Sequence, residues 1–386
     1  MKLINNLLKQ YFPPIQYLSP GIYHTRSQTI SKNRNRLHLR IEKSGEGILI
    51  INAKTVMHLN TTATEFAYHL IKKTPEMQVI NSMANRYNIS KDQAIQDYHN
   101  FLDILNKLDK TIDLDPVTFY GVERITPYSK RTLAPYRLDC ALTYRVSTNS
   151  HQKVAPQDRV IRELTTDEWI YILQKAWKAG IPHVIFTGGE PTMRNDLPQL
   201  IAETEKMGMV SGLLSDGLRL NDKKYRASLI KNGLDHIMHL LDPDNPKSWN
   251  ALAALMAEDI FVTVHLTITE RNKKIIESVI EKVASQGARS LSLTVANKSL
   301  TPTIKAIQDK AAHLNLSLVW DIPVPYSDFH PVALEMQEKN DRLIDGAGKA
   351  WLYLEPDGDV LPEQGINRVM GNLLTEKWET IWKRFK

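Results

Sequence analysis

The stretch Val184–Arg194, VIFTGGEPTMR, decides how the chain is interpreted. Its apolar beginning predicts a buried strand, which runs into a tight Gly-Gly turn and then into Glu-Pro. The amphipathic run Thr165–Gly180 predicts a helix before it, and Leu197–Met207 predicts a helix after it. This order of elements is typical of α/β folds, which bind ligands at the carboxyl ends of strands.

Four residues at this turn are suited to holding such a ligand. Gly188 and Gly189 lack side chains, so a ligand can approach the main chain there. The Glu190 carboxylate can accept hydrogen bonds from an ammonium or hydroxyl group, and Pro191 stiffens the turn by fixing φ. The same residues can equally form a tight turn that the fold needs for packing, and both interpretations stay open at this point.

The bulk composition is that of an ordinary globular protein. Of 386 residues, 42% are hydrophobic and 24% charged, which leaves room for two or three domains. The net charge of +6 is modest, and basic residues are scattered apart from Lys32–Arg40 and Lys130–Arg137, so we expect no nucleic-acid partner. No run approaches the roughly 18 apolar residues of a membrane span, and the N-terminus is too interrupted for a signal peptide. We therefore expect a cytoplasmic protein.

The N-terminal third predicts a small domain of its own. Residues 1–40 are rich in Pro, Asn, Ser and Arg and are expected to be mainly loops. The strands predicted next are Leu37–Ile41, Gly47–Ile51 and Val56–Leu59, and the helices are Thr61–Ile71, Met77–Tyr87 and Lys91–Leu108. A few strands followed by three helices favour a winged-helix domain.

This region resembles the PqqD-like peptide-recognition family. The likeness covers residues 40–110, from GILIINAKTVMHLNTTATEFAYHL to MANRYNISKDQAIQDYHNFLDILNKL. The LN-x-x-A element at Leu59–Ala63 and the helix around Asp97–Leu102 carry it. The resemblance implies an edge strand and a helix groove that bind a leader peptide by β-augmentation.

From Arg137 onward, predicted strands and helices alternate. The strand candidates are Arg137–Thr143, His183–Thr187, Val210–Ser215, His236–Leu241, Phe261–Thr267, Ser290–Val295 and Leu316–Trp320. The alternation indicates a parallel sheet, open or closed into a partial barrel. A hairpin is predicted for Trp351–Leu354 and Val360–Pro362, with a short helix at Glu376–Phe385. The aromatic residues of this last part are expected to fill its core.

Four stretches of this second region resemble the radical SAM superfamily, and the last resembles its SPASM or twitch subgroup. They are APYRLDCALTYR (Ala134–Arg145), FTGGEP (Phe186–Pro191), LLSDGLRL (Leu213–Leu220) and EPDGDVLPEQGI with MGNLLTEKWETIW. The resemblance implies an α/β fold: a partial (βα)6-type TIM barrel with a small hairpin-helix extension. It also implies a residual S-adenosylmethionine-type site, in which the Gly-Gly-Glu-Pro turn holds the amino group and Ser215 and Asp216 face the ribose. For these two residues an ordinary surface turn is the alternative.

The cysteines that this family needs are missing. Three of them, spaced C-x3-C-x2-C after the first strand, hold a [4Fe–4S] cluster. The matching positions here are Val146, Ser150 and Lys153, and the auxiliary-cluster position in the tail is Glu363. Valine has no donor atom, serine is a poor substitute for a soft thiolate, and lysine is cationic. We therefore expect no iron–sulfur cluster and no radical SAM catalysis, and S-adenosylmethionine is expected to bind weakly if it binds at all.

The remaining candidates for metal or acid–base chemistry are isolated. Cys140, the chain's one cysteine, lies inside the first strand of the barrel and is expected to be a small buried residue. His151 stands alone in the degenerate loop and is expected to be solvated. Asp242 and Asp244 follow a strand, where two carboxylates can serve acid–base work or a divalent ion; a cap for the helix near Lys247 is the preferred interpretation.

The sequence therefore predicts a PqqD-like domain (residues 1–112), a linker (113–136), a radical-SAM-like partial barrel (137–330) and a SPASM/twitch-like extension (331–386). The leading function is that of a pseudoenzyme that binds a peptide or protein, as an accessory factor in maturation of a ribosomally made peptide, with a cluster-bearing paralogue as a further partner.

The alternative is a cluster-independent enzyme or binder that holds S-adenosylmethionine or a similar molecule at the barrel mouth. It would use Glu190, Asp216, Asp242 and Lys153. A third interpretation, a cluster held by cysteines of another chain, would require a partner to supply every ligand.

Overall fold

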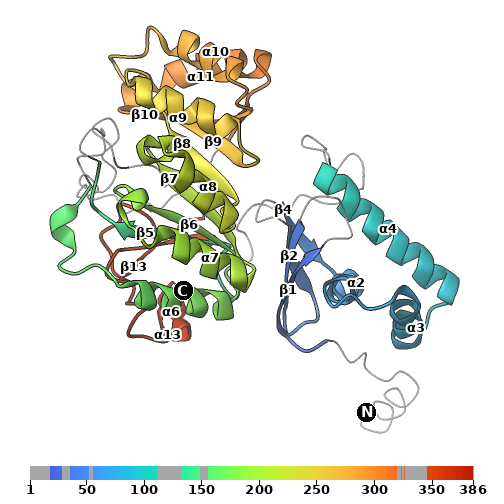
Figure 1. The fold of residues 1–386 in the computed structure, drawn as a ribbon. Coiled ribbons are helices and arrows are strands. Elements are labelled where there is room, and N and C mark those ends of the chain that lie inside the picture. Colours follow the sequence, from blue (N-terminus) through green and yellow to red (C-terminus); the bar gives the residue numbers. More distant parts are fainter. Residues whose placement is uncertain are drawn as a thin grey trace. The chain divides into compact units, whose positions relative to one another are not determined.

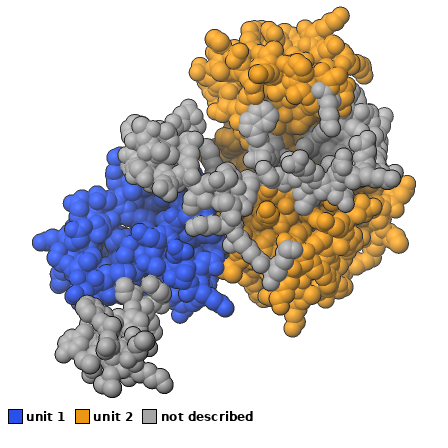
Figure 2. Space-filling model, turned by 180° about the vertical axis from the view of Figure 1, so that it is seen from behind, with its two compact units in different colours: residues 1–126 blue, residues 127–386 orange. Residues whose placement is uncertain are grey.

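The computed structural model describes residues 18–27, 35–51, 55–110, 132–147, 155–319, 323, 326 and 346–385. The chain divides into two compact units, Met1–Thr126 and Pro127–Lys386, which are coloured separately in Figure 2. Within the described part, no helix combines the length and the apolar character needed to cross a membrane.

The first unit is an antiparallel sheet followed by three helices. The strands are β1 (Gly21–Ser27), β2 (Asn35–Ile41), β3 (Gly47–Ile51) and β4 (Thr55–Leu59), in that spatial order. The helices are α2 (Thr61–Ile71), α3 (Glu76–Tyr87) and α4 (Lys91–Lys110). Alternate residues of β2 and β3 pack with all three helices in one core. The predicted strands and helices are confirmed here within a few residues.

Local signals account for the boundaries of these helices. The Asn60 side chain caps α2 by accepting a hydrogen bond from Ala63 N at 2.9 Å. Asn88 ends α3 in a left-handed conformation. The expectation of loops throughout residues 1–40 was wrong for β1, because this polar segment gains its strand from seven residue pairs with β2 and not from a pattern of its own.

The second unit is built on one mostly parallel sheet with the order β11-β10-β9-β8-β7-β6-β5-β12-β13 (Figure 1). Its first strands are β5 (Arg137–Thr143), β6 (His183–Gly188), β7 (Val210–Ser215), β8 (His236–Leu240), β9 (Phe261–Ile268), β10 (Ser290–Val295) and β11 (Ser317–Leu318). The intervening helices are α6 (Thr166–Ala179), α7 (Leu197–Met207), α8 (Lys223–Lys231), α9 (Pro246–Met256), α10 (Ile276–Ser285) and α11 (Thr301–His313). This is an α/β arrangement consistent with a radical SAM partial barrel.

The two faces of this sheet differ. Val184 and Phe186 of β6 join the large core between the strands and the helices. Ile185, which points the other way, joins Leu214 and Met238 in a small aliphatic cluster on the opposite face. The strand candidates are confirmed, although the last one shortens to the two residues of β11.

The C-terminal elements belong to the same sheet. Strand β12 (Trp351–Leu354) pairs in parallel with β5, and β13 (Val360–Leu361) pairs antiparallel with β12. Helix α13 (Trp378–Lys383) follows. The sequence predicted this hairpin and helix as a separate extension. The pairing of β12 with β5 could not be predicted, because the two strands lie far apart in the chain and neither carries a signal that specifies its partner. Trp351, Tyr353 and Trp378 are buried as expected.

Candidate functional site

The Gly-Gly turn lies at the carboxyl end of β6, against the segment that leaves β5. Gly189 N donates to Thr143 O at 2.8 Å, and Glu190 N donates to Arg145 O at 2.7 Å. A Cβ atom on Gly188 would lie 2.2 Å from Thr143 O, and one on Gly189 would lie 2.3 Å from Arg145 O. Gly188 also has φ +126, a conformation that L side chains rarely adopt. Both glycines are therefore required by close approach of the chain to itself, and the space that we had expected a ligand to use holds Thr143–Arg145.

The Glu190 carboxylate is buried and fully used by the protein. Its Oε1 accepts from Thr192 N at 3.0 Å, Thr192 Oγ1 at 2.6 Å and Ser215 Oγ at 3.0 Å, and its Oε2 accepts from Asp216 N at 2.8 Å. The exposed fraction of Glu190 is 0%. Burial, followed by the nearby Asp216 charge, raises the pKa of this carboxyl to about 8. Glu190 therefore joins the end of β6 to the end of β7.

Ser215 and Asp216 lie where the sequence placed them, beside Glu190. Ser215 Oγ accepts a hydrogen bond from Gly217 N at 3.0 Å while it donates to Glu190. Asp216 accepts from Ser147 Oγ at 2.8 Å and from Leu218 N at 2.9 Å. The structure thus brings Glu190, Ser215 and Asp216 together, and their polar atoms form a closed network with the segment after β5.

The first cluster position is used for packing. Val146 contacts a buried cluster formed by Ala141, Tyr144, Ala155, Tyr326, Tyr353 and Leu361. Cys140 is buried in β5 as expected, and its burial raises the pKa of the thiol well above the usual value. Ser150, His151 and Lys153 lie outside the described residues, and Glu363 is half-buried. Val146 and Cys140 thus do not fit an iron–sulfur cluster.

Hydrogen bonds and an ion pair at Glu355, which the sequence motifs did not indicate, connect this packed cluster to the tail. Tyr144 Oη donates to Glu355 at 2.8 Å, and Arg159 Nε lies 2.6 Å from the same carboxylate. Burial raises the pKa of Tyr144 and Tyr353 well above the usual value, so both phenols stay neutral. These contacts hold both ends of the degenerate loop against β12. The sequence features that could have indicated these contacts are Tyr144, close to the first missing cysteine, and the acidic run EPDGD in the tail.

The acidic side chains at the end of this hairpin also lie together. Oxygen atoms of Glu355, Asp357 and Asp359 are within 4.8 Å of one another. Glu355 already binds Arg159, and Asp359 accepts from Asn372 Nδ2 at 2.8 Å. The group is therefore stabilised by partners from the protein itself.

The predicted cap of α9 is provided by a different residue. Asn245 accepts from Lys247 N at 3.0 Å, whereas Asp242 accepts from Asp244 N at 3.1 Å within its own turn. A cap was correctly expected at this helix, but the capping residue is Asn245 and not an aspartate. The helix begins at Pro246, so the side chain immediately before it is best placed to cap.

In the first unit, β4 forms one edge of the sheet. Among the described strands it pairs with β3 alone. Val56 on this strand is 40% exposed. Among the described strands, β4 and β1 are therefore the two edges of this sheet.

Comparison with known proteins agrees with this architecture. A family model described as the radical SAM superfamily matches residues 140–296. The crystal structure of Streptococcus suis SuiB bound to precursor peptide SuiA is similar with a TM-score of 0.57 and 13% identity, over 95% of this chain and 88% of that chain. SuiB bound to S-adenosylmethionine is similar with a TM-score of 0.57 and 14% identity, over 90% and 86%. At such low identities, the similarity shows the fold alone. Residues 140–296 thus match the radical SAM superfamily model, and the second unit is similar in fold to these structures.

Proposed function

We propose that the chain is a radical-SAM-like pseudoenzyme that works without iron–sulfur clusters, as a peptide- or protein-binding accessory factor in peptide maturation. Residues 1–112 would be a PqqD-like recognition domain, 113–136 a linker, 137–330 the partial barrel and 331–386 a SPASM/twitch-like extension. A cluster-bearing paralogue is the partner that such a factor would assist.

The chemistry of the cluster position carries this proposal. The chain has one cysteine, and that thiol is buried inside β5. Val146, at the first cluster position, packs against buried tyrosines and alanines instead of presenting a ligand. Three thiolates are needed to hold three irons of the cluster, so the residues of this chain supply too few ligands of the right softness.

The peptide-binding role is supported by the edge of the first unit. Strand β4 has one described partner strand, and Val56 and Met57 lie along it. An extended peptide can add to such an edge through main-chain hydrogen bonds and place alternate side chains toward the helices. SuiB, a protein of similar fold, has been crystallised with a precursor peptide.

The alternative, S-adenosylmethionine binding at the Gly-Gly-Glu-Pro turn, is less well supported. Four donors from Thr192, Ser215 and Asp216 already occupy the two oxygens of Glu190. A ligand ammonium would have to replace at least one of these buried contacts, at about 1–3 kcal/mol for each donor left without a partner.

Selection of peptides from a randomised ten-residue display library tests the proposal on the full chain. We expect enriched peptides whose binding is lost in Val56→Pro or Met57→Pro, because proline removes a main-chain donor from the edge strand in one of the two positions. Val56→Ala is the matched control and should retain binding. Equal binding by all three variants would place the peptide elsewhere and contradict strand addition.

Calorimetric titration with S-adenosylmethionine distinguishes the small-molecule function from the pseudoenzyme. Micromolar binding of S-adenosylmethionine that disappears in Glu190→Ala would favour the small-molecule function over the pseudoenzyme.

A further inference from the structure

A shallow, open hollow of about 370 Å³ lies on the second unit and is lined mainly by charged and polar residues. Three chain segments line it: the one after β5, the one before α6 and the one before α7. Its charged lining residues are Arg145, Glu163, Arg194 and Asp196, so the formal charges cancel. Leu164 is the apolar lining residue. Such a surface suits a small polar ligand that carries both signs of charge.

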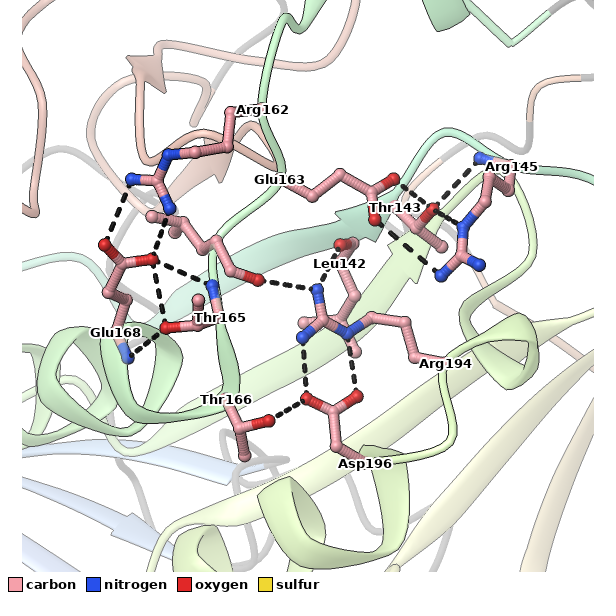
Figure 3. A network of polar contacts seen from close by, with 11 residues as sticks. Leu142, Thr143, Arg145, Arg162, Glu163, Thr165, Thr166, Glu168, Arg194 and Asp196 are labelled. Atoms are coloured by element: carbon pink, nitrogen blue, oxygen red, sulfur yellow. Dashed lines mark hydrogen bonds and ion pairs between the residues drawn. The ribbon is translucent and has the colours of Figure 1, made fainter.

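One of the two ion pairs is closed. Arg194 donates to Asp196 from Nε at 2.8 Å and from Nη2 at 2.6 Å (Figure 3). Its Nη1 donates to Leu142 O at 3.2 Å and Leu164 O at 2.9 Å. The side chain is 8% exposed. This bidentate pair is therefore part of the wall and has little capacity left for a ligand.

The other pair is open. Arg145 Nη2 and Glu163 Oε2 are 3.7 Å apart, beyond the range of a hydrogen bond, and the two side chains are 54% and 30% exposed. The buried Thr143 hydroxyl donates to Glu163 Oε1 and accepts from Arg145 Nε at 3.1 Å (Figure 3). It also accepts from Arg145 N at 3.1 Å. The Thr143 side chain thus holds Glu163 and Arg145 beside each other. Donors of the Arg145 guanidinium and Oε2 of Glu163 remain available to a ligand.

We propose that this hollow binds the zwitterionic head of an α-amino acid. The ligand carboxylate accepts from the Arg145 guanidinium, and the ligand ammonium donates to Glu163 Oε2. A simple anion would be repelled by Glu163 and a simple cation by Arg145, so neither fits both side chains. A molecule with both groups on one carbon satisfies both, and the Thr143 contacts lower the ordering cost of binding.

Titration of the full chain with L-alanine, observed by saturation-transfer NMR, tests the proposal. We expect at least tenfold weaker binding for N-acetyl-L-alanine, which lacks the ammonium, and for L-alaninamide, which lacks the carboxylate. Arg145→Ala and Glu163→Gln should each weaken L-alanine binding at least tenfold. Arg162→Ala is the matched control, because Arg162 pairs with Glu168 at 2.7 Å and does not line the hollow.

Equal binding of all three compounds, no saturable binding of L-alanine, or unchanged affinity in Arg145→Ala would each overturn the proposal. Circular dichroism melts of the variants, which alter exposed side chains, would exclude unfolding as the cause of lost binding. Free amino acids and S-adenosylmethionine carry the same head, and competition distinguishes them: displacement of L-alanine by S-adenosylmethionine assigns the hollow to the larger ligand, and no displacement assigns it to free amino acids. Either result leaves the peptide site at β4 untouched.

Discussion

Replacement of Glu190 by glutamine should change how the stability of the second unit depends on pH. Burial and the Asp216 charge raise the pKa of Glu190 from 4.5 to about 8. The folded state therefore binds a proton that the unfolded state releases between these values. The contribution of this proton to the free energy of unfolding is fully present below pH 4.5 and is lost as the pH rises through 8. Since one pKa unit corresponds to about 1.36 kcal/mol, the whole effect is about 5 kcal/mol, of which about 3 kcal/mol falls between pH 5.5 and pH 8.

Urea denaturation of wild type and Glu190→Gln at these two pH values measures the effect. The comparison with the variant is needed because other buried groups also titrate. Burial lowers the pKa of His236 and His239 to about 4, so their contribution to the free energy of unfolding is lost as the pH falls below 6.5, opposite in direction to the effect of Glu190. The stability of wild type relative to Glu190→Gln should fall by about 3 kcal/mol from pH 5.5 to pH 8.

Glu168→Gln is the matched control. Its hydrogen bonds to Arg162 and to Thr165 N lower the pKa of Glu168 to about 2, so this side chain does not titrate in the same window and its replacement should give a constant difference. A constant difference for Glu190→Gln as well would refute the view that a buried, titrating Glu190 joins β6 to β7.

Three further outcomes are expected. Gly189→Ala should destabilise the second unit by about 2–4 kcal/mol in urea denaturation, because its Cβ would lie 2.3 Å from Arg145 O and disturb the hydrogen bonds there; a loss below about 0.5 kcal/mol would show that the turn can relax. Tyr144→Phe should cost about 1–3 kcal/mol by leaving Glu355 with one partner fewer, and an unchanged midpoint would remove the tyrosine cluster from the loop's support. Cys140 should react with a thiol reagent after unfolding and not before, since it is buried in β5; rapid reaction in the native state would contradict its position.

Much of the fold was predictable because the signals are local. The alternation of apolar strands and amphipathic helices, with caps such as Thr165 and Gly180 around α6, fixes element type and order. The segment β1 and the pairing of β12 with β5 depend on contacts between residues far apart in the chain. A pattern within one segment carries no information on such partners.

The candidate site was predictable in place and not in role. Gly188, Glu190, Ser215 and Asp216 do come together at the ends of β6 and β7. Residue type alone suggested that Glu190 faces a ligand, whereas the structure surrounds it with four donors from the protein. The open pair in the hollow, Arg145 with Glu163, was missed because Glu163 belongs to no motif and the alignment of the two side chains depends on Thr143.

With one cysteine, buried inside β5, this chain is expected to hold no iron–sulfur cluster. Anaerobic reconstitution of the full chain with iron and sulfide, followed by Mössbauer and electron paramagnetic resonance spectroscopy, tests it most directly. Cys140→Ala serves as the control for iron bound to the single thiol. We expect both proteins to retain only substoichiometric, unspecific iron after desalting. A stoichiometric [4Fe–4S] signal in the wild-type chain would contradict it.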